Sequence, residues 1–303
     1  MHLRIYWSLT VFFICFQIYA QSYSGVKAPF INKSFDAFKT GESLKFRIHY
    51  GFFNASHATL NLEEDVVEGK KVFKATAIGR TTGIARFFFK VEDIYETFFD
   101  KNLVQPIKST RNIYEGGYTK NVEINYDYSN SLANINDIKN SRLSSVKIQK
   151  NVQDLISTFY YLRNHFDVKK LKKNDFIRIN IFFDAENYPF RMKFLGYEDV
   201  YTKFGIINCL KFRPFIESGR VFRDNESLTL WVSNDKNKLP IKIEAGLRIG
   251  SIEADLEEFR GLKHPFKIKL NEAIFSAIHR GLLGFQVRFL DAKDGPLETS
   301  DDF

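Results

Sequence analysis

Apolar and polar residues alternate with a period of two along almost the whole chain. In the stretch ESLKFRIHYG, Phe46 and Ile48 fall on one face of an extended segment, while Arg47 and His49 fall on the other. Because successive side chains of a β-strand point to opposite faces, this pattern predicts a strand with one buried face. About a dozen such strands joined by brief turns favour antiparallel pairing, since parallel neighbours need long crossovers. The chain is therefore predicted to be mainly β: a strongly curved antiparallel sheet, an open barrel or a sandwich.

Turn residues mark the points where the strands reverse. Glu68 and Gly69 separate two alternating runs, and the pair Gly116 and Gly117 separates two more. A type I′ hairpin turn requires positive φ at both central residues, which glycine accepts without a steric penalty. The stretch from residue 129 to residue 145 is polar and is predicted to be less ordered.

One segment has helical periodicity instead. In NVQDLISTFYYLRNHF, residues 151–166, apolar residues recur at spacings typical of a helix, and Asn151 is the expected N-cap. The recurring positions are Val152, Leu155, Ile156, Phe159, Leu162 and Phe166. This single helix is predicted to pack against the sheet. A short helical turn is also expected at GIARFFF, residues 83–89.

The start of the chain has the features of a secretory signal peptide over residues 1–20. A positive charge at Arg4 precedes an uncharged apolar stretch, and the small residue Ala20 precedes QSYSG. The stretch is about 15 residues long, shorter than the roughly 20 that span a bilayer, so cleavage after Ala20 is favoured over a retained anchor. Lipid attachment at Cys15 is a further alternative, disfavoured by the bulky residues before it. No later segment has a transmembrane pattern.

The rest of the chain is predicted to form one domain with two flanking segments. Residues 21–37 are an N-terminal linker, residues 38–266 are a single β domain, and residues 267–303 are a C-terminal extension. The extension contains an amphipathic helix pattern at Ile274, Phe275, Ile278, Leu282 and Leu283. Docking on the body of the protein or on a partner is favoured for this helix, and a poorly structured extension is the second alternative. Contact with an anionic membrane is disfavoured, because residues 267–303 carry five basic and six acidic residues.

The net charge of the chain limits the classes of partner that it is expected to bind. The formal net charge of +8 comes from 44 basic and 36 acidic residues that are scattered along the sequence. A basic exported protein is attracted to anionic lipid headgroups, lipopolysaccharide or acidic glycans. The densest basic run, from Asp167 to Asp175, is flanked by acidic residues and is interpreted as a solvated turn. Export and the lack of a basic-aromatic motif argue against nucleic-acid binding.

The stretch LTLWVSNDKNKLPIKIE, residues 228–244, is predicted to be a hairpin. The cluster NDKN turns the chain, and Pro240, which cannot donate a ladder hydrogen bond, marks a strand start or a sheet edge. Trp231 falls on the face opposite its apolar neighbours Leu230 and Val232. A second layer of the protein or a ligand is therefore expected to cover the indole ring.

The sequence contains none of the common catalytic motifs. A Gly-X-Ser-X-Gly elbow, a phosphate-binding loop and a His-Glu-X-X-His segment are all absent from it. His49 and His57 are close enough to meet on adjacent strands, but no third ligand lies near them, so no metal or cofactor is predicted. Adjacent carboxylates such as Glu257 and Glu258 are expected to point to opposite faces of a strand, which argues against paired acids for glycoside cleavage.

Cys209 is the single thiol once residues 1–20 are removed, so an intramolecular disulfide is excluded. It lies in GIINCLKF among apolar residues, which is typical of a buried structural cysteine rather than a nucleophile. Stability is expected to come from burial instead, since 44% of the residues are hydrophobic and 16% are aromatic.

Four segments, taken together, resemble a bacterial exported family. They run in order from Phe38 to Phe266 and read FKTGESLKFRIHYGFFNASHATL, LISTFYYLR, YPFRMKFLGYEDVYTKFGIINCLKF and LTLWVSNDKNKLPIKIEAGLRIGSIEADLEEF. Their set and order are similar to the family designated domain of unknown function 3108. The resemblance implies a mostly β protein of the Gram-negative envelope with no established activity, cofactor or catalytic motif. The extension beyond Phe266 departs from the pattern.

The sequence therefore favours a non-enzymatic protein of the periplasm or the outer-membrane periphery that binds a lipid-like or amphipathic ligand or serves as a scaffold. Candidates to line a ligand groove are Phe46, Ile48, Phe73, Tyr95 and Trp231. The same side chains suit the packed interior of a barrel. The alternative is a hydrolase of cell-wall or lipid material, which requires a cleft where two or three of His49, His57, an acidic residue and Cys209 converge within hydrogen-bond reach. The ligand, the protein partner and the oligomeric state are left open.

Overall fold

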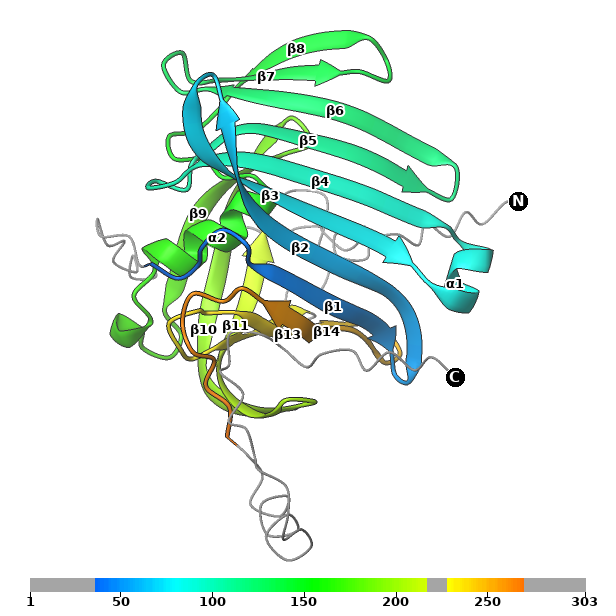
Figure 1. Cartoon of the computed structure of the whole chain (residues 1–303), viewed down its shortest axis with the longest axis vertical. Coiled ribbons are helices and arrows are strands. Elements are labelled where there is room, and N and C mark those ends of the chain that lie inside the picture. The colour runs from blue at the N-terminus through cyan, green and yellow to red at the C-terminus, as the bar shows by residue number, and fades with distance from the viewer. Residues whose placement is uncertain (1–35, 217–227, 270–303) are drawn as a thin grey trace, which may run out of the picture.

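The computed structural model describes residues 36–216 and 228–269 of the chain. Fourteen strands in these residues form one antiparallel sheet that curves strongly but does not close (Figure 1). The predicted fold class is confirmed, with somewhat more strands than expected. The predicted signal peptide of residues 1–20 and the amphipathic pattern of residues 274–283 lie outside the described residues.

The sheet is a meander of neighbouring strands. Its strands are β1 (Ser43–Tyr50), β2 (Phe53–Val67), β3 (Lys70–Thr81), β4 (Val91–Asp100), β5 (Pro106–Glu115), β6 (Tyr118–Asp127), β7 (Leu132–Asp137), β8 (Arg142–Lys147), β9 (Phe176–Phe183), β10 (Glu186–Thr202), β11 (Gly205–Ile216), β12 (Leu228–Ser233), β13 (Pro240–Gly246) and β14 (Ser251–Arg260). The order across the sheet is β8-β7-β6-β5-β4-β3-β2-β1-β14-β13-β12-β11-β10-β9. The pairing of β1 with β14 joins the two halves of the chain, and β8 and β9 are the edges.

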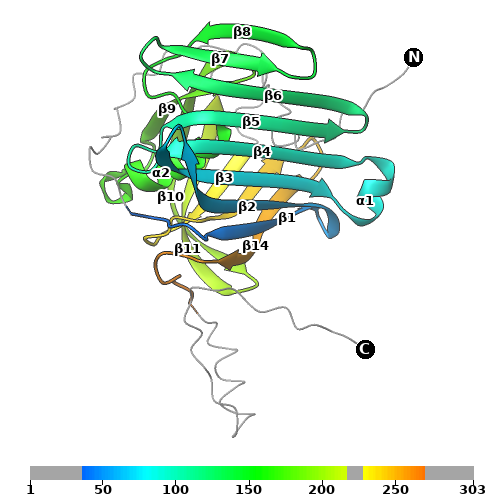
Figure 2. The same ribbon diagram turned by 45° about the horizontal axis from the view of Figure 1, so that its top comes forward.

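The curvature brings the edge strand β9 against the inner face of β6 (Figure 2). Gln153 forms a parallel bridge with Ile181 of β9, and its carbonyl accepts the N–H of Phe182 at 2.7 Å. The Phe182 ring meets Tyr126 of β6 edge to face, with centroids 6.1 Å apart. The two halves of the sheet thus share one interior, although β8 and β9 form no ladder with each other.

Within the described residues, the helices are α1 (Gly83–Phe88), α2 (Leu155–His165) and a short 3-10 helix, η2 (Val168–Lys170). α1 coincides with the expected helical turn. α2 lies inside the curve of the sheet (Figure 1), where it contacts β3, β4 and β9. None of these helices is long and apolar enough to cross a membrane.

α2 begins after Asp154 rather than after the predicted cap, Asn151. The Asp154 carboxylate accepts the N–H of Ser157 at 2.7 Å, and the Ser157 hydroxyl accepts the N–H of Asp154 at 2.9 Å. This capping box satisfies N–H groups that the helix itself leaves unpaired. Asn151 has a positive φ of 58° and belongs to the turn before the bridge to β9. The prediction was wrong because the reciprocal pair starts the helix more effectively than a lone asparagine.

The main apolar cluster lies between α2 and the first strands of the sheet. Tyr160 of α2 packs edge-on against Phe38, with centroids 4.8 Å apart, and tilts over Phe99 at 5.3 Å. Phe38 in turn meets Phe73 of β3 edge to face at 5.7 Å. All four rings are buried. Because full burial of a large apolar side chain contributes about 1.5–3 kcal/mol, these rings hold α2 in the interior.

The polar stretch of residues 129–145 is ordered, contrary to the prediction, and supplies most of β7 and β8. Ala133 and Ile135 are buried on one face of β7, whereas β8 is a largely exposed edge strand. The turn before β7 is fixed by Asp127, whose side chain accepts the N–H of Asn130 at 3.0 Å. Such Asx turns stabilise a hairpin with little apolar burial, so the hydrophobic pattern missed it.

Residues 228–244 form the predicted hairpin of β12 and β13, and Pro240 is the first residue of β13. The loop of residues 234–239 folds onto the C-terminus of α2. The Lys238 ammonium donates to the carbonyl oxygens of Arg163 and Phe166 at 2.9 and 2.8 Å. A cation at this position satisfies carbonyls that the helix end leaves unpaired. The loop of this hairpin thus joins the sheet to the C-terminus of α2 through the two hydrogen bonds of Lys238.

Candidate functional site

A small polar pocket lies inside the curve of the sheet, between β4, β5, β6, the start of α2 and the end of β9. Its polar lining includes Tyr95, Thr97, Ser109, Arg111, Tyr126, Asp154 and Asp184. Tyr95 of β4 is directly opposite Arg111 of β5 in the sheet register. Side chains of directly paired residues share a face, so strand alternation places both of them in the interior.

Arg111 is the fixed positive charge of this pocket. It is 8% exposed, donates a hydrogen bond to Asp184 at 2.8 Å, and lies 4.6 Å from the centroid of the Phe183 ring. Lys120 donates to the same carboxylate. Burial raises the pKa of Asp184, but Arg111 and Lys120 outweigh burial and hold that pKa below its usual range. Asp184 is therefore a carboxylate at neutral pH, neutralised by two cations.

Asp154 forms the opposite wall of the pocket. Burial raises its pKa to about 6, although the N–H of Ser157 favours the charged form. Nearby, the hydroxyls of Ser109 and Tyr126 lie 3.3 Å apart, and burial raises the pKa of Tyr126 as well. These groups form hydrogen bonds readily, but they hold no activated nucleophile.

The size of the pocket limits its use. Its volume is about 20 Å³, which suits about one ordered water molecule. Pockets for drug-sized ligands are usually about 300–1,000 Å³, so a lipid chain does not fit here without a rearrangement of α2 or β9. In this arrangement the pocket is a polar space of about the size of one water molecule within a packed interior.

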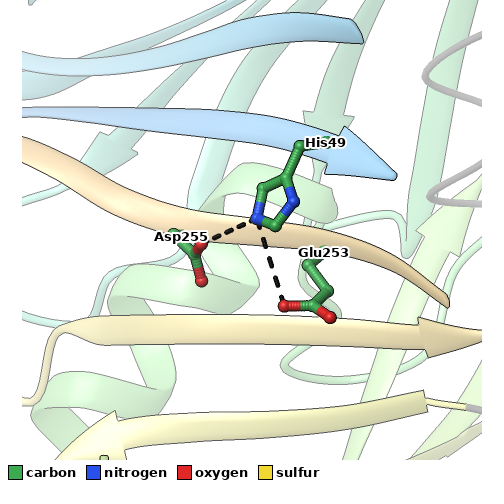
Figure 3. A group of neighbouring side chains, drawn as sticks. All are labelled: His49, Glu253 and Asp255. Atoms are coloured by element: carbon green, nitrogen blue, oxygen red, sulfur yellow. Dashed lines mark hydrogen bonds and ion pairs between the residues drawn. The ribbon is translucent and has the colours of Figure 1, made fainter. Parts of the chain in front are cut away.

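A second cluster consists of His49 of β1 with Glu253 and Asp255 of β14 (Figure 3). His49 is 7% exposed, and its Nε2 lies 2.8 Å from Asp255 and 4.0 Å from Glu253. These three side chains have the ligand types and spacing of a candidate metal site. They meet because the β1–β14 register sets His49 opposite Glu253, two residues from Asp255.

Hydrogen bonds decide what this cluster does. His49 Nδ1 lies 2.6 Å from the carbonyl oxygen of Gly51, which accepts only, so Nδ1 carries a hydrogen. On the carboxylates, Arg47 donates to Asp255 Oδ2 at 3.3 Å and Lys242 donates to Glu253 Oε2 at 2.5 Å. The oxygens that a metal would need already accept from cationic side chains. Both ring nitrogens of His49 and both carboxylates thus have partners within the protein, whereas a metal would have to displace Lys242.

The glutamate doublet of β14 differs from expectation. A bulge in the β1–β14 ladder leaves Glu257 without a partner residue in β1. Glu258 forms an ion pair with Lys45 at 2.6 Å, and Glu257 Oε2 lies 3.2 Å from His57 Nε2. Lys45 and His57 lie on the same face, since His57 is opposite Arg47. The prediction of opposite faces was wrong because a bulge adds one residue and breaks the alternation.

Cys209 of β11 lies far from the histidines. Three strands, β12, β13 and β14, separate β11 from β1, so Cys209 does not lie on a strand next to those of His49 and His57. The thiol is fully buried, and burial raises its pKa to about 12. Of the residues that a hydrolase could use, His49 meets Asp255 and Glu253, and His57 meets Glu257, whereas Cys209 is buried apart from both histidines.

The predicted lining residues divide into three environments. Phe46 and Phe73 pack in the main apolar cluster, Tyr95 lines the polar pocket, and Ile48 is half-buried in β1. Trp231 also belongs to the main apolar cluster and is 6% exposed. The ammonium groups of Lys211 and Lys242 lie 5.0 and 5.8 Å from its ring centroid, and its Nε1–H donates to Glu198 at 3.1 Å. A role for these five residues in ligand binding stays a prediction.

Pattern reasoning from the sequence missed the polar pocket. Arg111 points to the same face of β5 as Ser109 and Ile113, and this face is buried. A charged residue on the buried face of a strand was therefore the available signal. Asp184 comes from the distant β9–β10 turn, and no local pattern connects it to β5.

Sequence comparison assigns the chain to a family. The model of the family described as protein of unknown function, DUF3108, matches residues 45–257, which is more than half of the chain. The chain belongs to this family. The DUF3108 match runs from within β1 to within β14, and so includes part or all of every strand of the sheet. No curated protein matches the chain in sequence.

Solved structures similar to this DUF3108 chain have very different sequences. One is a β-barrel-like protein of the domain of unknown function DUF1849 from Brucella abortus, at 9% identity and a TM-score of 0.47, covering 74% of this chain and 98% of that chain. Another is a protein with a YmcC-like fold from Bacteroides fragilis, at 9% identity and a TM-score of 0.31, covering 75% and 99%. Similarity at this level transfers no function to the chain.

Proposed function

We propose that this protein is an exported, non-catalytic component of the Gram-negative cell envelope that acts by binding, as a scaffold for a partner or for an amphipathic ligand. The signal-peptide pattern of residues 1–20 supports export. Membership of DUF3108, a family described only as a protein of unknown function, is consistent with this proposal and adds no activity to it.

One observation carries the non-catalytic part of the proposal: the side chains best suited to chemistry are each committed to structure. Both ring nitrogens of His49 already have oxygen partners, His57 is paired with Glu257, and Cys209 is fully buried. A hydrolase needs a nucleophile and a base within hydrogen-bond reach of each other and of the substrate. The described residues offer no such pair among these three.

The scaffold form of the proposal has more support than an internal lipid site. α2 and its aromatic neighbours occupy the interior, and the pocket beside them is of water size. Binding is therefore expected at the outside of the sheet or at its rims. An amphipathic ligand inside would require α2 to leave the cluster around Tyr160.

Native mass spectrometry of the protein purified from the envelope of its own host tests the proposal, followed by organic extraction and identification of bound molecules. The proposal predicts either a stoichiometric amphipathic ligand or a co-purifying envelope protein. Turnover of a cell-wall or lipid substrate by the purified protein, lost on substitution of His49, would contradict it and would establish the hydrolase alternative.

A further inference from the structure

Exposed apolar side chains gather at one end of the sheet and form what is called here the apolar rim. The rim comprises Phe52 and Phe53 of the β1–β2 turn, Ile84, Phe87 and Phe88 of α1, and Ile249 of the β13–β14 turn. Their exposed fractions range from 44% to 102%. Single exposed apolar residues are common on soluble proteins, but a contiguous group of this size marks an interaction surface.

The three parts of the rim are neighbours in space. The Tyr50 hydroxyl donates to the carbonyl oxygen of Ile249 at 3.1 Å, which ties the β13–β14 turn to the end of β1. The N–H of Thr82, just before α1, donates to the carbonyl oxygen of Ala55 at 3.1 Å in β2. Figures 1 and 2 show α1 and the β1–β2 turn side by side at this end of the sheet.

α1 presents its apolar residues outward. None of its residues is buried, and it has no side-chain cap. The Phe87 and Phe88 rings contact each other edge to face, with centroids 5.4 Å apart. A helix on the surface of a soluble domain normally turns its apolar stripe toward the core, and a helix this short is not stable by itself. The orientation of α1 indicates that another apolar phase covers it.

The charge around the rim is positive. In residues 50–54, 80–92 and 246–251, four basic residues accompany one acidic residue; the basic residues are Arg80, Arg86, Lys90 and Arg248. Asp93, which is buried, and Glu115, which pairs with Val91, add two acidic residues behind the rim, so the excess of positive charge is small. The acidic residue, Glu92, forms ion pairs with Arg86 at 2.7 Å and Lys90 at 2.8 Å, so two cations share one carboxylate. Positive charge next to protruding aromatic rings is the composition of proteins that bind the interface of an anionic bilayer.

We propose that the apolar rim docks on an anionic membrane surface, with Phe52, Phe87 and Phe88 inserted among the lipid headgroups. Arg86 and Lys90 would then lie beside lipid phosphates. The rim suits a bilayer because its side chains protrude from separate turns, and a deformable headgroup layer accommodates such a shape. This inference rests on the proposed function, since export is what brings the chain beside the envelope membranes.

Vesicle co-sedimentation of the exported protein, purified from cells, tests the inference. The probes are vesicles with about 30% phosphatidylglycerol in phosphatidylcholine and vesicles of phosphatidylcholine alone. The rim variant carries Phe52→Ser, Phe87→Ser and Phe88→Ser. The matched control carries Val66→Ser, Leu103→Ser and Tyr201→Ser, which are 59%, 60% and 78% exposed in the wild type. These residues lie near the end of β2, in the β4–β5 turn and near the end of β10, away from the rim.

Wild type and control are expected to sediment with the anionic vesicles. The rim variant is expected to bind these vesicles at least roughly tenfold more weakly than wild type. The substitutions Arg86→Gln and Lys90→Gln should weaken binding to anionic vesicles only. Wild-type protein that stays in the supernatant, or a rim variant that binds like wild type, would overturn the inference. A rim-dependent dimer in sedimentation velocity, without vesicle binding, would assign the rim to a second copy. Failure of vesicle binding leaves export and the scaffold role untouched.

Discussion

The guanidinium of Arg163 in α2 holds the carboxylate of Glu42 with two hydrogen bonds of 2.6 and 2.7 Å, and both side chains are buried. The Arg163 Nε–H also donates to the carbonyl oxygen of Asn237 at 2.9 Å. Through these contacts α2 is joined both to the segment before β1 and to the loop before β13. The interior helix is thus fixed by polar bonds at one end and by aromatic packing along its length.

Loss of this ion pair is expected to destabilise the fold strongly. Glu42→Ala leaves a buried guanidinium without its anion, which costs about 3–5 kcal/mol. The double variant Glu42→Leu, Arg163→Met removes both charges and should lose less stability than Glu42→Ala. Urea unfolding followed by Trp231 fluorescence measures the difference. A Glu42→Ala protein within experimental error of the wild type would contradict the structural role of the pair.

Lys238 gives the stability a characteristic dependence on pH. Burial lowers its pKa to about 8 from the usual 10.5. Between these two values the unfolded chain binds more protons at Lys238 than the folded chain does, so this contribution to the free energy of unfolding rises with pH. Below about pH 8 the cost of burying the charge is constant. The rise across the window is on the order of 2 kcal/mol.

The comparison of wild type with Lys238→Met isolates this effect, since the other titrating groups are common to both proteins. The difference in unfolding free energy, wild type minus variant, should increase from pH 8 to pH 10.5, as measured by urea unfolding at each pH. A flat difference would show that Lys238 titrates at the same pH in the folded and unfolded chain.

Cys209 is expected to be unreactive in the folded protein. Thiol reagents attack the thiolate, and the buried thiol has a pKa of about 12. In the chain without residues 1–20, a chromogenic disulfide reagent at pH 8 should therefore label Cys209 only after urea is added. Stoichiometric labelling of native protein within minutes would show an accessible thiol and would revive its candidacy as a nucleophile.

Zn²⁺ is not expected to stabilise the protein through His49. Lys242 and Arg47 already bond the carboxylate oxygens of Glu253 and Asp255 that the ion would need. Thermal unfolding with about 100 μM Zn²⁺ should give the same Tm shift in wild type and in His49→Gln. A rise in Tm that occurs in the wild type and disappears in His49→Gln would identify a true metal site.

Period-two alternation was enough to predict the curved antiparallel sheet, because most strands have one buried face and one face that is more exposed to solvent. It failed for β7 and β8, where Asx turns rather than apolar residues specify the hairpin. It also failed at Glu257 and Glu258, because a bulge arises from the pairing of two strands and cannot be recognised in the sequence of one strand. The start of α2 was misplaced because Asn151 was given weight over the reciprocal pair of Asp154 and Ser157.

The clusters were harder to predict than the sheet. His49 and Asp255 are distant in sequence, and they meet only because β1 pairs with β14. Arg111 and Asp184 are also distant in sequence, and they meet only because the sheet curls far enough to bring the β9–β10 turn to β5. The apolar rim could have been anticipated in part, since Phe52 and Phe53 stand in a turn. Its extent follows from the lateral order of the strands, which alternation does not specify.

The most direct test of the central claim is the intact mass and cellular location of the protein in a Gram-negative host. Export predicts a chain that begins at Gln21 and is released by outer-membrane permeabilisation, or by high salt if it is held at a membrane surface. A full-length chain in the cytoplasm would contradict export, and with it the proposal that the protein is a binding component of the envelope. A chain that begins at Cys15 and carries acyl groups would replace the predicted cleavage with lipid anchoring.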